Sequence, residues 1–117
     1  MSADKTTRIH LGDGSFFRSK EWLEPGIEVT VLVVGESELK LYDDSVVLVD
    51  RNEDGFYSVV RSRNLCSLAE VPEEDVKELG FADLFHLAKS LRHRYPELTW
   101  HDKVTVLRFF VYEGYSE

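Results

Sequence analysis

The sequence predicts an α+β fold: a small β-barrel of five to six strands with two to three flanking helices. Residues 28–34, 45–50 and 104–112 are rich in the β-branched and aromatic side chains that favour strands. One strongly amphipathic helix, over residues 81–94, precedes the last of these runs. The length of 117 residues fits one domain. We therefore expect a single domain over residues 1–117, with loose ends at residues 1–6 and 114–117.

The N-terminal third is expected to contain two strands and a short helix. Residues 8–11 are a candidate first strand. Ser15 is a typical N-cap, so we expect a short helix from Ser15 through about Leu23. The Pro-Gly pair that follows ends this helix and turns the chain. Residues 28–34 are apolar at nearly every position, which indicates a central strand.

The middle of the chain predicts a hairpin followed by helices. Residues 45–50 and 56–65 both have strand character, and the Asp54-Gly55 step between them favours a hairpin turn. Pro72 stands at a tolerated first position of a short helix, and the acidic residues after it complement the helix dipole. A glycine ends this helix before the amphipathic one begins.

The charge and the single cysteine limit the classes of protein. The net charge of -8 disfavours wrapping a long duplex, because a polyanion is repelled. No apolar run approaches the ~20 residues that cross a bilayer, and the N-terminus lacks the apolar core of a secretory signal. Cys66 is the only cysteine, and the four histidines are scattered, without metal-ligand spacing. We expect a cytoplasmic monomer without a cofactor, a metal or membrane contact.

The C-terminal half carries a resemblance to a known family. Residues 67–111 contain an acidic helix with a Gly-Phe step (EEDVKELGF), a helix that ends at Tyr95-Pro96 and a final strand VTVLRFF. This segment resembles the C-terminal half of the ASCH family, and a weaker similarity extends back to residue 16. The layout is similar to that of the shortest bacterial members, some of which are acetylcytidine amidohydrolases. The resemblance implies a PUA-like β-barrel that binds RNA or a modified nucleoside.

The chain departs from the functional trio of the amidohydrolase branch, which is a lysine, a threonine and a glutamate. Glu28 occupies the lysine position, and the threonine position falls on Val31, or on Thr30 if the alignment slips by one residue. Leu79 occupies the glutamate position, with Glu78 beside it. Amide hydrolysis needs a positive group near the developing oxyanion, and these positions offer acids without an adjacent cation. We therefore expect a binding domain without catalysis.

Several polar residues are candidates for ligand contact. Arg61 and Arg63 are expected to alternate onto one face of their strand. Lys20 could replace the missing lysine, and a Glu28–Glu78 carboxylate pair is the other substitute. The predicted ligand-binding residues are Arg18, Lys20, Glu28, Thr30, Arg61, Arg63 and Glu78. An amidohydrolase acting on acetylated cytidine and a protein-interaction module remain the alternatives to RNA or nucleoside binding.

Two further groups of residues have both a structural and a functional interpretation. The helix over residues 81–94 ends in a basic cluster, which either complements the helix dipole or contacts phosphate. This cluster consists of Lys89, Arg92, His93 and Arg94. Phe16, Phe17 and Trp22 either pack in the core or stack on a base, and Trp100 and Tyr112 are expected to be structural.

Overall fold

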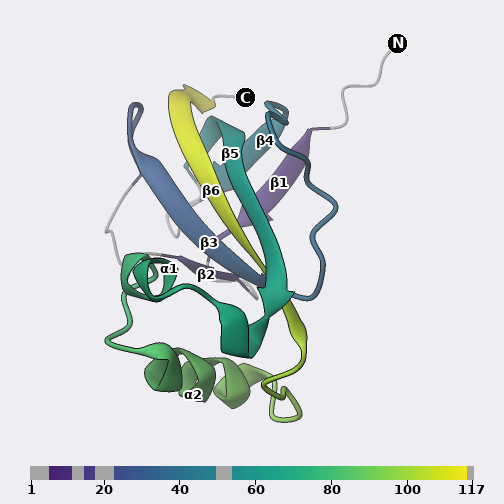
Figure 1. Ribbon diagram of the computed structural model, residues 1–117. Coiled ribbons are helices and arrows are strands. Elements are labelled where there is room, and N and C mark those ends of the chain that lie inside the picture. The colour runs from purple at the N-terminus through teal and green to yellow at the C-terminus, as the bar shows by residue number, and fades with distance from the viewer. Residues whose placement is uncertain (1–5, 12–14, 18–22, 50–53, 116–117) are drawn as a thin grey trace.

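One mixed sheet curls strongly into a half-barrel, and two short α-helices pack beside it (Figure 1). The computed structural model describes residues 6–11, 15–17, 23–49 and 54–115, with the backbone alone for residues 15–17 and 115. The sheet order is β1-β4-β5-β6-β3-β2. The strands are β1 (Thr7–His10), β2 (Ser15–Phe17), β3 (Glu28–Val34), β4 (Val46–Val49), β5 (Gly55–Ser67) and β6 (Lys103–Tyr115). The helices are α1 (Glu73–Glu78), α2 (Leu84–Arg94) and a 3-10 turn at Leu68–Glu70.

The last strand holds the sheet together. β6 pairs antiparallel with β5 along one edge and with β3 along the other. β1 joins the opposite side of the sheet by parallel pairing with β4, and β2 pairs antiparallel with β3. The predicted α+β class and strand number are confirmed, as is the pairing of the final strand, which extends to Tyr115. The edge strands β1 and β2 lie at opposite ends of the sheet order and do not pair with each other. The curled sheet therefore stays open as a half-barrel.

The two faces of the sheet bury different cores, because successive side chains of a strand point to opposite sides. On the face that we call inner, side chains from β3, β4, β5 and β6 pack against one another. These include Val31, Leu48, Val60, Leu107 and Phe109. The other, outer face packs against the helices at the end of the sheet near α2 (Figure 1). This second core joins Leu32, Val104 and Val106 of the sheet to Leu87 and Leu91 of α2.

The end of α1 and the start of α2 are each marked by a capping residue. Gly80 follows α1 with a φ of 95°, a left-handed conformation that a glycine adopts without strain. The Asp83 side chain caps α2 by accepting a hydrogen bond from the His86 backbone N–H at 2.9 Å. The helix therefore starts at Leu84, three residues after the predicted start, and Phe81 packs against the outer-face core instead.

The N-terminal prediction is wrong at the proposed short helix. Ser15–Phe17 forms β2, which pairs with residues 31–33 of β3, so Ser15 is not a helix cap. A three-residue strand has little pattern of its own, and its pairing with β3 decides its conformation. Residues 18–22 lie outside the described part of the chain, and with them the predicted Arg18, Lys20 and Trp22.

The predicted hairpin of β4 and β5 is confirmed, but its connection differs. Gly55 already pairs with Val49, so it belongs to β5 and is not part of a two-residue turn. No helix within the described ranges is long and apolar enough to cross a membrane.

Candidate functional site

A polar site lies on the outer face of the sheet, next to the part that the helices cover. The pairing of β3 with β6 places Thr30 opposite Arg108 and Glu28 opposite Phe110. Residues paired across antiparallel strands have side chains on the same face, with Cβ atoms about 4.5–5.5 Å apart. The next pair along this face, Leu32 and Val106, is already part of the core beneath the helices. Polar side chains therefore begin on this face directly beside the core that the helices cover.

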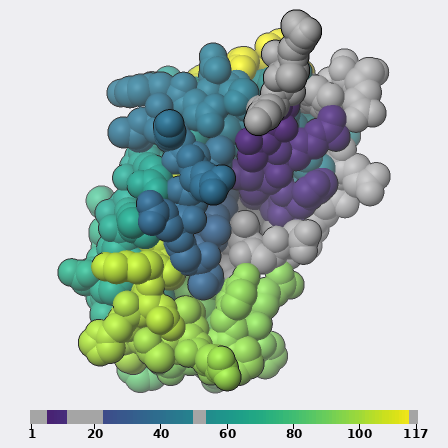
Figure 2. Space-filling model, turned by 90° about the vertical axis from the view of Figure 1, so that its right-hand side faces the viewer, coloured from purple at the N-terminus to yellow at the C-terminus, as the bar shows by residue number. Residues whose placement is uncertain are grey.

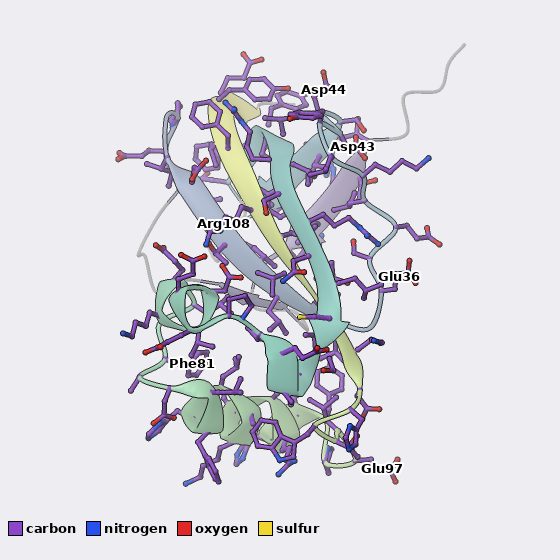
Figure 3. All side chains as sticks on the ribbon, in the orientation of Figure 1. Glu36, Asp43, Asp44, Phe81, Glu97 and Arg108 are labelled. Atoms are coloured by element: carbon purple, nitrogen blue, oxygen red, sulfur yellow. The ribbon has the colours of Figure 1, made fainter. Side chains whose placement is uncertain are left out.

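Arg108 joins this face to helix α1. Its Nη2 donates a hydrogen bond to Oδ1 of Asp75 at 2.5 Å, and the two side chains form an ion pair. In Figure 3 the Arg108 side chain projects from β6 into the space between β3 and α1. The Asp75 side chain is 9% exposed, whereas that of Arg108 is 31% exposed. The carboxylate is thus held in place, and the guanidinium remains partly open to solvent. We call the group of Thr30, Asp75 and Arg108 the Arg108 site.

Acidic side chains of α1 stabilise the charged form of Arg108. The hydrogen bond to Asp75 raises the pKa of Arg108 above its ordinary value, and the negative charges of Asp75, Glu74 and Glu78 add to this effect. Partial burial acts in the opposite direction and is weaker. The site is therefore a fixed positive charge beside several carboxylates.

The Arg108 site contains polar atoms that have no partner among the described residues. Thr30 is 4% exposed, and within the described ranges its hydroxyl makes no hydrogen bond. The bond between Arg108 and Asp75 is also the only side-chain hydrogen bond that either residue forms with the described part of the protein. Buried polar groups nearly always have a partner. A buried hydroxyl opposite a guanidinium, with no partner in the described part of the chain, is therefore a place where a ligand or ordered water can bind.

Aromatic side chains continue the outer face beyond the Arg108 site. The Arg61 guanidinium lies over the ring of Phe110, with Cζ 4.9 Å from the ring centroid. Farther along, Tyr57 and Tyr112 stack with their ring centroids 6.3 Å apart. The Tyr112 hydroxyl donates to the backbone oxygen of Asp44 at 3.2 Å. Burial and nearby acids raise the pKa of Tyr112 above its ordinary value, so the hydroxyl stays protonated at neutral pH.

Arg61 and Arg63 do not share a face, contrary to the prediction. A β-bulge between Val60 and Ser62 breaks the alternation of the strand, leaving Arg61 on the outer face with Phe110. Arg63 pairs with Leu107, whose side chain belongs to the inner core.

Arg63 has a structural role in this arrangement. It donates a hydrogen bond to the backbone oxygen of Ser37 at 2.7 Å and forms an ion pair with Glu36 at 3.4 Å. These contacts fasten the segment between β3 and β4 to β5. Figure 3 places Glu36 on that segment, beside β5 and away from Arg108. In the space-filling view of Figure 2, the same segment (blue) covers the side of the molecule next to β1 (purple).

The structure brings together four of the seven residues that the sequence pointed to. Glu28, Thr30, Arg61 and Glu78 lie on or beside the outer face around Arg108. Arg63 lies apart from them, and Arg18 and Lys20 fall outside the described residues.

The geometry also resolves two ambiguous positions. Val31 is fully buried in the inner core, so Thr30 is the residue that faces the site. Leu79 is buried beneath the helices, which leaves Glu78 as the acid near Arg108.

The sequence did not lead us to predict two residues of the site, Arg108 and Asp75. Arg108 was present in the quoted motif VTVLRFF, where a charged side chain interrupts an otherwise apolar strand. That interruption was the available signal for a functional position. Asp75 had no such signal, because it lies within a run of acidic residues. The expectation that Glu28 and Glu78 have no adjacent cation is wrong for Glu78, because Arg108 lies near its carboxylate.

The described residues contain no group of three His, Cys, Asp or Glu side chains that could hold a metal ion. Comparison with protein-family models, with curated proteins and with solved structures finds no match to this chain. The geometry of the Arg108 site therefore carries the functional argument.

Proposed function

We propose that this protein is a cytoplasmic module that binds a modified nucleoside, or a short stretch of RNA, at the Arg108 site. The observation that carries this proposal is the buried Thr30 hydroxyl, which has no partner among the described residues and stands opposite Arg108. A nucleobase edge presents hydrogen-bond donors and acceptors side by side. Arg108 supplies donors, Asp75 supplies an acceptor and Thr30 can act as either.

The surrounding charge favours a nucleoside over a long RNA. Glu74 and Glu78 lie near Arg108, and Glu28 stands one pair farther along β3. A phosphate entering this site would meet these carboxylates, and the net charge of -8 adds to the repulsion. A neutral base and sugar avoid that penalty. The exposed side of the Phe110–Arg61 pair offers a flat surface beside the site on which such a base can stack. The resemblance to ASCH domains supports the same class of ligand.

The test is an NMR titration of the isotope-labelled protein with cytidine, N4-acetylcytidine and a short RNA oligomer. We expect a nucleoside to shift the amide signals of Thr30, Arg108 and Phe110. Arg108→Lys should remove these shifts, because a lysine keeps the charge but loses the planar set of donors. Lys40→Ala, which removes a positive charge from an exposed position elsewhere, is the control. Unchanged signals around Arg108 at millimolar nucleoside would overturn the proposal and leave a protein-interaction module as the next candidate.

One observation favours amidohydrolase activity as a second candidate. Arg108 provides the positive group whose absence argued against catalysis. However, Asp75 already engages this guanidinium, so less of its charge is available to a developing oxyanion, and losing one such donor costs about 3–4 kcal/mol. We expect no measurable deacetylation of N4-acetylcytidine, followed by its absorbance. Turnover that disappears in both Thr30→Val and Arg108→Lys would instead establish the enzyme.

A further inference from the structure

Phe85 of helix α2 forms an aromatic pair with the half-buried Trp100, which lies in the segment between α2 and β6. Phe85 is 76% exposed, although large apolar side chains are usually covered. Its ring meets Trp100 edge to face, with centroids 6.1 Å apart and an angle of 64° between the planes. The buried side chains of α2, Leu87, Ala88 and Leu91, point to the core instead. In Figures 1 and 2, α2 and the segment that follows it form the lower end of the molecule.

An arginine fixes the aromatic pair in place. Arg92 lies over the Trp100 ring, with Cζ 5.4 Å from the ring centroid. Its Nε donates a hydrogen bond to the backbone oxygen of Leu98 at 3.0 Å, which orders the side chain. Among the residues that the structure describes, none accepts a hydrogen bond from the terminal nitrogens of this guanidinium, which leaves them for another contact. A surface ordered in this way loses little conformational entropy when it binds a partner.

The charge around this aromatic pair is opposite to that of the whole protein. Lys89 and Arg92 follow Phe85 by four and seven positions and therefore lie on the same side of α2. The segment over residues 81–103 carries four lysine or arginine residues, three acidic residues and three of the four histidines. The full chain carries 22 acidic and 14 basic residues. With four basic and three acidic side chains, this segment has a net charge of +1, whereas the whole chain has a net charge of -8.

We propose that Phe85, Lys89, Arg92 and Trp100, the α2 stripe, bind single-stranded RNA independently of the Arg108 site. An unpaired base stacks on the exposed Phe85 ring, and the phosphates on either side contact Lys89 and the free nitrogens of Arg92. Aromatic rings alternating with positive charges fit a chain of bases and phosphates. An acidic peptide would use the charges but not the exposed ring face. This inference goes beyond nucleoside binding at the Arg108 site.

Fluorescence anisotropy with labelled octauridylate tests this surface. We expect binding that weakens steeply with added salt, because each phosphate contact releases counterions. Phe85→Ala should weaken binding about tenfold through the loss of stacking. Lys89→Ala should weaken it less and reduce the salt dependence. The matched controls are Tyr42→Ala and Lys40→Ala. Tyr42 is a 74% exposed aromatic residue and Lys40 an exposed lysine, and both lie in the segment between β3 and β4, outside the α2 stripe. Both controls should bind as the unaltered protein does.

Equal losses in the variants and their controls would overturn the proposal, as would an absence of binding at low salt. If octaglutamate displaces octauridylate and Phe85→Ala does not change the binding, the surface binds an acidic peptide instead. A duplex RNA of the same length should bind more weakly than the single strand, because its bases are not free to stack. The Phe85→Ala variant should still respond normally to free nucleoside at Thr30 and Arg108. Failure of the α2 stripe and failure of the Arg108 site are therefore distinguishable.

Discussion

Replacing Arg108 with alanine should destabilise the protein more than any exposed charge substitution. The change leaves the Asp75 carboxylate, whose side chain is only 9% exposed, without the hydrogen bond and the ion pair that Arg108 provides. Breaking a fully buried ion pair by removing one partner costs about 3–5 kcal/mol. The Arg108 side chain is 31% exposed, so water can reach the vacated space and part of this penalty is relieved. We therefore expect the free energy of unfolding to fall by about 2–3 kcal/mol.

A double-mutant cycle separates the pair from its surroundings. Asp75→Asn keeps a hydrogen-bond acceptor for Arg108 and should cost about 1 kcal/mol. The double variant should be more stable than Arg108→Ala alone, because no uncompensated carboxylate remains. Urea unfolding followed by far-UV circular dichroism measures all three variants. Lys77→Ala is the control, since it breaks the exposed ion pair with Glu73 at 3.2 Å and should change stability by less than about 1 kcal/mol. A double variant less stable than Arg108→Ala would refute the reasoning.

Three further predictions follow from contacts elsewhere. Arg63→Ala should lower the free energy of unfolding by about 1–2 kcal/mol through its lost loop contact, and Arg61→Ala by less than about 0.5 kcal/mol, in urea unfolding. A hydrogen bond from an α2 backbone N–H holds the pKa of Asp83 below its ordinary value. Its stabilising contribution, present above the ordinary pKa, is lost as the pH falls through the folded-state pKa. Asp83→Asn should therefore make the loss of stability at acid pH less steep in a pH titration followed by circular dichroism. Burial raises the pKa of the Cys66 thiol, and nearby acids, Asp75 included, raise it further. Alkylation by iodoacetamide should therefore rise at a higher pH than for a free thiol, and at a lower pH in Asp75→Asn.

Each of these predictions has a contrary outcome. Equal losses of stability in Arg61→Ala and Arg63→Ala would contradict the separation of the two arginines by the β-bulge. If Asp83→Asn leaves the loss of stability at acid pH unchanged, protonation of Asp83 does not contribute to acid unfolding. Alkylation of Cys66 with the pH profile of a free thiol would show that its surroundings do not affect its ionisation.

Local patterns in the sequence were sufficient for most of the elements. Burial determines the apolar runs of β3 and β6 and the 3.6-residue period of α2, so these elements could be recognised in the sequence. β2 could not be predicted in this way, because its three residues form a strand only through pairing with β3.

The site was harder to predict than the fold. Arg108 and Asp75 are 33 residues apart in sequence, and only the packing of α1 beside β6 brings them together. The choice between Thr30 and Val31 depended on strand register, where a slip of one residue exchanges the two faces of the sheet. The positions of Arg61 and Arg63 depended on a β-bulge that no local pattern announces.

The position of β6 between β3 and β5 has a consequence for how the chain folds during its synthesis. β2 and β3 form one hydrogen-bonded group and β1, β4 and β5 form another, and in the sheet order only β6 connects them. Residues 103–115 must leave the ribosome before either group can join the other. The earlier strands would meanwhile expose apolar side chains and unpaired edges, which favour aggregation. Folding of the nascent chain should therefore be late and cooperative, with transient dependence on chaperones until β6 closes the sheet.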